Sequence, residues 1–370
     1  MVLAAALAGC STSAPPPVAP PPAASVATAA STPLPPPAAS APAPAGPVRD
    51  AALFLTHGDK GPAEADLEAG ERALDADDFT AAAAAYQSAA TKAPRDAAPV
   101  VGLVRVMLAK AKAPTSAGSG PKSTVLADAV RELERAASLD PAFLPAQVDL
   151  GHALLVLGDA EGAVKVLRRA LPLGKDSAET HSALGLALLA SGVKDEAVTE
   201  LARAAQLDPG EVARHRNLGK ALMSSGRLVD AMAALSRAFE LTPGDPRAAS
   251  DLAVARLAAG DVETAIGLLE KAISLDPKRA TFHANLAYAR TLKGDLEGAV
   301  TSARKAVELD DHLASGFINL GIALARQKKI AEARQAFEKA QALDPTDPRP
   351  KNNLDELPPE PKKPPSKKKK

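Results

Sequence analysis

The chain contains a single cysteine, Cys10, which lies between a short apolar run at residues 2–9 and a proline-rich stretch. One thiol cannot form an internal disulfide bond, and it cannot supply a zinc site built from several cysteines. The apolar run is too short to cross a bilayer as a helix. The chemistry left to Cys10 is therefore that of a lone nucleophilic thiol.

The tetrapeptide Leu7-Ala8-Gly9-Cys10 resembles the lipobox of bacterial lipoproteins. The resemblance implies cleavage after the glycine, transfer of diacylglycerol to the Cys10 thiol, and anchoring by acyl chains without a spanning helix. Ser11 rather than Asp follows, which in proteobacterial lipoproteins is typical of export to the outer membrane. No Lys or Arg precedes Cys10, so we expect the signal peptide, here residues 1–9, to begin upstream of Met1. The alternative is a cytosolic protein with a chance match.

A second set of polar residues recurs at a spacing of 34 residues, namely Asn217, Asp251, Asn285 and Asn319. An amide side chain both donates and accepts hydrogen bonds, so such a series could hold the backbone of a bound peptide. The alternative is that these side chains face water.

Basic residues are expected on the same face as this series, at Arg216, Lys220 and Arg247. Neighbouring cations of this kind could bind an acidic side chain or a terminal carboxylate. Solvated surface charge is the alternative for each of them.

Three histidines, His181, His215 and His283, also recur in one register. Packed helices of successive units would separate them by about 10 Å. That distance is too large for a shared zinc ion, whose bonds are about 2 Å long. We therefore expect packing residues here, and the sequence predicts no metal, no cofactor and no small-molecule substrate.

The elements that must position these residues repeat every 34 residues between residues 63 and 345. Each unit has one helical half, a turn with glycine, and a second helical half that ends before a proline such as Pro209 or Pro243. Small residues in both halves let the two helices approach closely, and large residues such as Leu167 and Leu201 fill the space between neighbours. In the second unit, extra residues predict a loop between the two helices.

This pattern is similar to the tetratricopeptide repeat family, with a small residue at the eighth position, alanine at the twentieth and twenty-seventh, a large apolar residue at the twenty-fourth and proline at the thirty-second. The resemblance implies an all-α solenoid, a right-handed superhelix of about eight helix-turn-helix units, with disordered segments at both ends. Residues 346–357 are expected to form a partial capping helix. The flanking parts are a Pro/Ala-rich linker (10–49), a connecting segment (50–62) and a lysine-rich tail (358–370).

In this family the first helices line a concave groove that binds a peptide or a partner helix. The resemblance places the second, fifth, sixth, ninth and twelfth positions of each unit in the groove, and the asparagine series falls at the sixth position. Glu64, Glu71 and Glu179 are expected on the same face, where they counter its basic residues.

The composition and the lack of catalytic motifs argue against two further classes of function. Lys plus Arg and Asp plus Glu both number 44, so the charge balance offers no case for nucleic-acid binding. No catalytic motif stands out and the repeats leave no space for a catalytic domain, so we expect no enzyme.

The resulting hypothesis is an outer-membrane lipoprotein on the periplasmic face. It would bind a protein partner and help to assemble an envelope complex for secretins or pili, motility, secretion or outer-membrane assembly. The alternatives are a soluble cytosolic adaptor of the co-chaperone type and an accessory subunit of an envelope enzyme.

Overall fold

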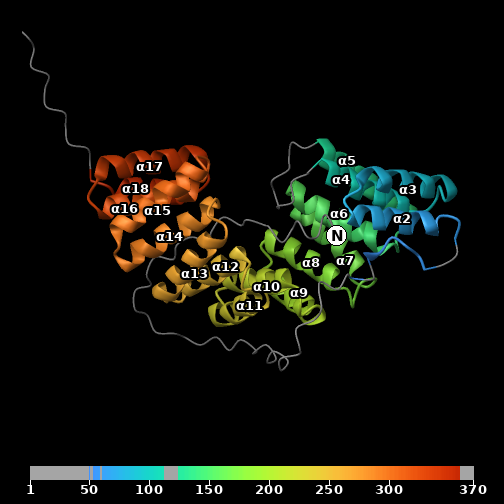
Figure 1. Cartoon of the computed structure of the whole chain (residues 1–370), viewed down its shortest axis with the longest axis horizontal. Coiled ribbons are helices and arrows are strands. Elements are labelled where there is room, and N and C mark those ends of the chain that lie inside the picture. Colours follow the sequence, from blue (N-terminus) through green and yellow to red (C-terminus); the bar gives the residue numbers. More distant parts are fainter. Residues whose placement is uncertain (1–49, 51–52, 59–60, 112–123, 359–370) are drawn as a thin grey trace, which may run out of the picture. The chain divides into compact units, whose positions relative to one another are not determined.

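The computed structural model describes Asp50 and residues 53–58, 61–111 and 124–358 of the 370-residue chain. Cys10, the predicted signal peptide, the predicted linker and all but the first residue of the predicted tail lie outside these residues. The described part contains 17 helices and no strands (Figure 1), which confirms the predicted all-α repeat fold. None of these helices has the length and apolarity needed to span a bilayer.

The described chain divides into two compact units, which meet in sequence between Leu241 and Thr242. Unit 1 contains the helix pairs α2 (Glu64–Asp75) and α3 (Phe79–Lys92), α4 (Ala98–Lys110) and α5 (Thr124–Leu139), α6 (Leu144–Leu157) and α7 (Ala160–Ala170), α8 (Ala178–Ala190) and α9 (Lys194–Leu207), and α10 (Val212–Ser224) and α11 (Leu228–Leu241). Unit 2 contains the pairs α12 (Pro246–Ala258) and α13 (Val262–Leu275), α14 (Ala280–Lys293) and α15 (Leu296–Leu309), and α16 (Ala314–Arg326) and α17 (Ile330–Leu343), followed by α18 (Pro348–Glu356).

Two series of alanines form the tightest part of each helix pair. They occupy the twentieth and twenty-seventh positions of the repeat, and every one of them is 0% exposed: Ala82, Ala129, Ala163, Ala197, Ala231, Ala265, Ala299 and Ala333, and then Ala89, Ala136, Ala170, Ala204, Ala238, Ala272, Ala306 and Ala340. A larger side chain at these places would have to push neighbouring helices apart, because protein interiors leave few voids.

The small residue at the eighth position packs against the large residue at the twenty-fourth position of the same repeat. A Cβ atom added to Gly185 would come within 2.6 Å of the Leu201 side chain, and one added to Gly321 within 2.5 Å of the Phe337 ring. Real Cβ atoms do not approach other atoms so closely, so glycine is required by space at these positions rather than by backbone conformation.

The turn between the two helices of a pair needs a left-handed residue. Gly192 has φ of +83° and Gly260 has φ of +84°, while Asp77 and Lys328 hold the same place in the first and last repeats with φ of 56° and 63°. An aspartate often follows and begins the second helix: Asp159, for example, accepts a hydrogen bond from the backbone N–H of Gly162 at the start of α7.

The second helices end two residues before the repeat proline, as predicted. Asp208 and Asp276, each of which precedes a proline, leave the helical region with φ of −132° and −139°, because the proline ring disfavours helical geometry in the residue before it. α15 ends the same way at Leu309 although Asp311 replaces the proline, whereas α7 ends early at Ala170 because Pro172 interrupts it.

The last helix, α18, covers the end of unit 2. Leu354 and Leu357 are partly buried and pack against the core made by Leu320, Leu324 and Phe337. A terminal repeat of a stacked array would otherwise leave an apolar side exposed, so this helix acts as a cap.

The close approach at Gly321 gives a direct test. We expect Gly321→Ala to lower the free energy of unfolding by about 1–3 kcal/mol through overpacking against Phe337. The matched control is Gly267→Ala in α13, where an added Cβ would meet nothing within 4 Å. That control should stabilise the chain by up to about 1 kcal/mol, because alanine is the better helix former. Urea unfolding followed by circular dichroism would measure both, and equal effects would contradict the packing argument.

Candidate functional site

The first helices of successive pairs contact one another within each unit. In unit 1, α2 contacts α4, α4 contacts α6, α6 contacts α8 and α8 contacts α10, and in unit 2 α12, α14, α16 and α18 do the same in order. We call the surface of these first helices that carries the second, fifth, sixth and ninth positions the inner face. It is the surface on which the sequence places the candidate binding residues.

In unit 1 the inner face holds a segment of the chain itself. We call Asp50 with residues 53–58 the inner segment. Leu55 is 0% exposed and belongs to the core of unit 1, and Leu53 packs against the same core. The sequence predicted only a connecting segment here, so the binding of this segment is a finding of the structure.

Two glutamates of α2 accept hydrogen bonds from the backbone of the inner segment. Leu55 N–H donates to Glu71 Oε1 at 2.7 Å. His57 N–H and Gly58 N–H donate to the two oxygens of Glu64 at 3.1 Å and 2.8 Å. Because Glu64 and Glu71 occupy the second and ninth positions of their repeat, these contacts agree with the predicted inner-face register.

Arg105 of α4, at the ninth position of its repeat, donates to the carbonyl oxygen of Leu53 through both terminal nitrogens at 3.4 Å. Its Nε also donates to Asp149 Oδ2 of α6 at 2.7 Å, and both side chains are buried. Burial would raise the pKa of Asp149, but the adjacent guanidinium outweighs this effect and lowers the pKa. The ion pair therefore fixes the guanidinium where it meets the segment.

The N-terminus of α8 holds the other end of the inner segment. Asp50 Oδ2 accepts a hydrogen bond from Ser177 Oγ at 2.6 Å and from the Glu179 backbone N–H at 3.3 Å. Ser177 is also the N-cap of α8 and accepts from the Thr180 N–H at 3.1 Å. The helix dipole favours a carboxylate at this place.

A second buried ion pair lies beside this contact. Glu179 accepts from Arg214 of α10 at 2.6 Å, and its Oε1 lies 3.3 Å from His152 Nε2 of α6. Burial is the largest single influence and raises the pKa of Glu179, but the Arg214 charge, the adjacent His152 and the hydrogen bond from Arg214 together shift it downward. Burial also lowers the pKa of His152, more strongly than Glu179 raises it. The sequence signalled Glu179 but missed the pairing, because Arg214 lies 35 residues away on another helix.

The predicted asparagine series makes contacts between first helices in unit 2. Asn319 Nδ2 donates to the Ala284 carbonyl oxygen at 2.8 Å, and Asn285 Nδ2 donates to Ser250 Oγ at 3.4 Å. Each amide therefore donates one N–H group to the preceding repeat. Binding of a partner by this series stays a prediction. Asp251 is half-buried in α12.

The remaining predicted residues fall in different units. Asn217 and Arg216 are 5% and 4% exposed in α10, and Lys220 of the same helix is half-buried. Arg247 is exposed at the start of α12 in unit 2, 3.6 Å from Asp245. Because Arg247 belongs to the other unit, the predicted cluster of three basic groups stays a prediction.

The recurring histidines contact backbone carbonyl groups at the junction between repeats. His215 Nε2 lies 2.9 Å from the Pro209 carbonyl oxygen, and His283 Nε2 lies 2.9 Å from that of Pro277. His181 makes the equivalent contact with Lys175 at 3.0 Å and also meets Glu200 at 2.6 Å. Gln147 occupies this register in α6 and donates to the Pro141 carbonyl at 3.3 Å. The series therefore bonds backbone carbonyl groups six residues earlier.

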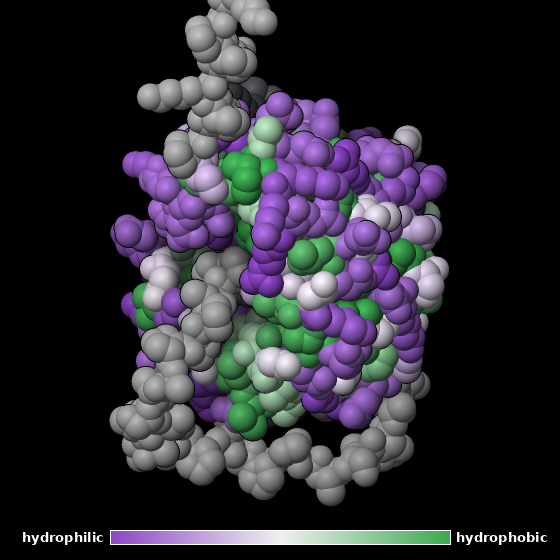
Figure 2. Space-filling view, turned by 90° about the vertical axis from the view of Figure 1, so that its left-hand side faces the viewer, coloured by the Kyte–Doolittle hydropathy of each residue, from purple (hydrophilic) through white to green (hydrophobic). Residues whose placement is uncertain are grey.

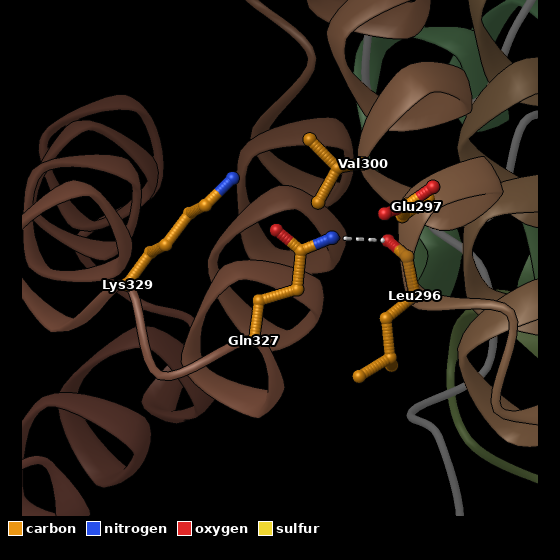
Figure 3. Close-up of a pocket in the computed structure, with 5 residues that line it drawn as sticks. All are labelled: Leu296, Glu297, Val300, Gln327 and Lys329. Atoms are coloured by element: carbon orange, nitrogen blue, oxygen red, sulfur yellow. Dashed lines mark hydrogen bonds between the residues drawn. The ribbon is translucent and has the colours of Figure 1, made fainter.

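A pocket of about 560 Å³ lies away from the inner face, between the start of α15 and the turn that joins α16 and α17. Its lining is Leu296, Glu297, Val300, Gln327 and Lys329, and Gln327 Nε2 donates to the Leu296 carbonyl at 3.0 Å (Figure 3). The polar contact joins two repeats, so we assign this pocket a structural role.

Exposed apolar residues offer no obvious alternative surface. The large hydrophobic side chains that are most exposed are scattered over different elements: Leu139, Leu173, Val193, Val229, Leu275 and Leu292. In the view of Figure 2, hydrophilic residues cover most of the visible face and hydrophobic residues appear in patches between them. The inner face therefore remains the best candidate binding surface in the described part of the chain.

Comparison with known families supports the repeat assignment. Profiles described as tetratricopeptide repeat match residues 126–187, 188–254, 250–314 and 314–347, which is more than half of the chain. No curated protein matches the sequence.

Solved structures of other proteins are similar to this chain. The crystal structure of the APC/C hetero-tetramer Cut9-Hcn1 is similar with a TM-score of 0.57 at 16% identity, over 75% of this chain and 52% of that chain. A tetratricopeptide repeat protein from Parabacteroides merdae gives 0.55 at 16% identity, over 62% and 91%. MamA from Desulfovibrio magneticus gives 0.42 at 26% identity, over 46% and 96%.

The histidine contacts give a second test. We expect His283→Ala to lower the free energy of unfolding by about 1 kcal/mol, because the Pro277 carbonyl loses its donor. His283→Gln should retain most of the stability, since Gln147 makes the same contact in α6. Thermal unfolding of the two variants beside the wild type would decide; a loss of the same size in both would show that the hydrogen bond is not the source.

Proposed function

The chain belongs to the tetratricopeptide repeat family, a family of protein–protein interaction scaffolds, and from this premise we propose that it helps to assemble or stabilise a complex of the bacterial cell envelope. In this proposal it has no catalytic activity, and a segment of a partner protein lies against the inner face. The observation that carries the proposal is the way unit 1 holds a separate stretch of polypeptide, which begins with a turn at Asp50 to Leu53 and is bound largely through its backbone.

The chemistry of that contact suits peptide binding in general. Carboxylates of Glu64 and Glu71 accept backbone N–H groups, and the Arg105 guanidinium donates to a backbone carbonyl. Every peptide presents backbone N–H and carbonyl groups, so a face that binds these groups can bind partners that differ in their side chains. Bound side chains then supply specificity through burial.

Two pairs of titratable groups on the inner face are engaged with each other. Arg105 is paired with Asp149, and Arg214 with Glu179, all within buried surroundings. Removing one partner from such a pair is strongly destabilising, because the other charge stays buried. This arrangement supports a structural and binding role.

The envelope part of the proposal rests on the sequence around Cys10. We propose that Cys10 carries the lipid that anchors the chain to the periplasmic face of the outer membrane, because Leu7-Ala8-Gly9-Cys10 resembles a lipobox and a proline-rich stretch follows it. The stretch would separate the repeats from the membrane surface.

Lipidation has a direct readout. Cells that express the full gene are grown with radiolabelled palmitate, and the chain is recovered from membrane and soluble fractions. We expect label and membrane association with the wild type, and loss of both with Cys10→Ser. An unlabelled wild-type chain in the cytosol would replace this proposal with the cytosolic adaptor.

Partner binding is tested by a cross-linked pull-down from detergent-solubilised envelopes. We expect an envelope component to be captured by the wild type and reduced at least about tenfold by Asn285→Ala with Asn319→Ala, if the amides contribute about 1.4 kcal/mol to binding. Because Asn319 also bonds the Ala284 carbonyl, the thermal stability of the variant is measured as well. Equal capture by both chains would exclude the asparagine series as the binding site.

A further inference from the structure

We propose that the inner segment is an intramolecular ligand of unit 1, so that a partner peptide of the same chemistry binds this inner face only by displacing it. The proposal rests on the scaffold function above and names both the surface and the kind of partner. That partner is a peptide with a carboxylate followed, three and five residues later, by leucines, as in Asp50, Leu53 and Leu55, which makes a turn from the carboxylate residue to the first leucine, since the Leu53 N–H donates to the Asp50 carbonyl at 3.0 Å.

The segment is held through its backbone along several first helices. Its amides bond α2 at Glu71 and Glu64, its Leu53 carbonyl bonds α4 at Arg105, and Asp50 bonds the start of α8. The segment therefore runs across the helices in the direction opposite to their order in the chain. The contacts on α4 and α8 lie beyond the helix that follows the segment in the chain, so the segment binds the inner face as a ligand does.

Two side chains set the preference for sequence. Leu55 is fully buried among the core residues of unit 1, so a polar residue there would lose its hydration without compensation. The Asp50 carboxylate meets a hydroxyl donor and a backbone N–H at the N-terminus of α8, where a negative charge is favoured. His57 adds a contact of 3.0 Å between Nε2 and Asp96 Oδ2, and its ring lies 5.8 Å from that of Phe143.

The covalent link makes the segment a strong competitor. A tethered ligand acts at an effective concentration of about millimolar, so a free peptide with the same contacts binds poorly while the segment is in place. Releasing the segment should therefore raise the affinity of the inner face for that peptide without changing the face itself.

Hydrogen exchange of the full wild-type chain tests whether the segment is bound. We expect the amide groups of Leu55, His57 and Gly58 to exchange at least about tenfold more slowly than in a synthetic peptide of residues 50–58, because they donate to Glu71 and Glu64. Equal rates in the chain and the peptide would overturn the proposal.

Competition tests whether the segment blocks the inner face. A fluorescein-labelled peptide, DAALFLTHG, is titrated into the full chain and followed by anisotropy. We expect Leu55→Glu to bind it at least about tenfold more tightly than the wild type, because the segment can no longer bury this residue. The matched control is Leu173→Glu, a leucine of unit 1 that is 44% exposed, which should behave as the wild type.

Folding of each variant is checked by circular dichroism and thermal unfolding. If Leu55→Glu loses helix content, Asp50→Lys takes its place, since it removes the carboxylate from the α8 terminus without entering the core. Equal affinity for the wild type and the folded variant, or no binding to either, would overturn the proposal. The titration uses only the purified chain, so the scaffold proposal, which is tested in envelopes, can fail independently of this result.

Discussion

The close approach of the two helices in each pair is the constraint on which the rest of the structure depends. Alanines that are fully buried at two positions of every repeat, and glycines such as Gly185 packed on Leu201, bring the helices together. Side chains larger than these would separate the pair and shift the next pair as well, because each repeat packs mainly on its neighbours. The left-handed turn and the aspartate caps follow from the same requirement, since the chain must reverse direction within a few residues.

The inner face is a consequence of this packing. Once every second helix packs against its own first helix, the first helices contact one another, and polar residues of successive repeats come within hydrogen-bond distance. In unit 1 those residues form the ion pairs Arg105–Asp149 and Arg214–Glu179, and the guanidinium of Arg105 also donates to the inner segment. In unit 2 the same register carries Asn285 and Asn319, whose amides join neighbouring repeats. One backbone scaffold thus supports two chemically different surfaces.

Much of this could be predicted from local patterns. The helix pairs, the turn glycines and the proline-terminated second helices follow from a 34-residue period, because helix formation and termination depend on residues close together in the sequence. The early end of α7 could also have been read from Pro172. The histidines were expected to be packing residues, and the structure shows that their ring nitrogens lie within hydrogen-bond distance of the carbonyl groups six residues earlier. The asparagine series was interpreted as a binding feature. The structure shows that these amides also form contacts within the fold, and the repeat pattern does not distinguish the two roles.

The sequence by itself determined the repeat, its register, the positions of close helix packing and the faces on which polar residues fall. Only the tertiary structure decided what those polar residues contact. Asp50 and Ser177 are 127 positions apart and Arg105 and Leu53 are 52 apart, and neither pairing follows the repeat period. A periodic pattern specifies contacts between equivalent positions of adjacent units, whereas a segment outside the pattern finds its place through the shape and charge of the assembled surface. For that reason residues 50–62 read as a plain connection in the sequence, while the structure shows part of them bound to the inner face.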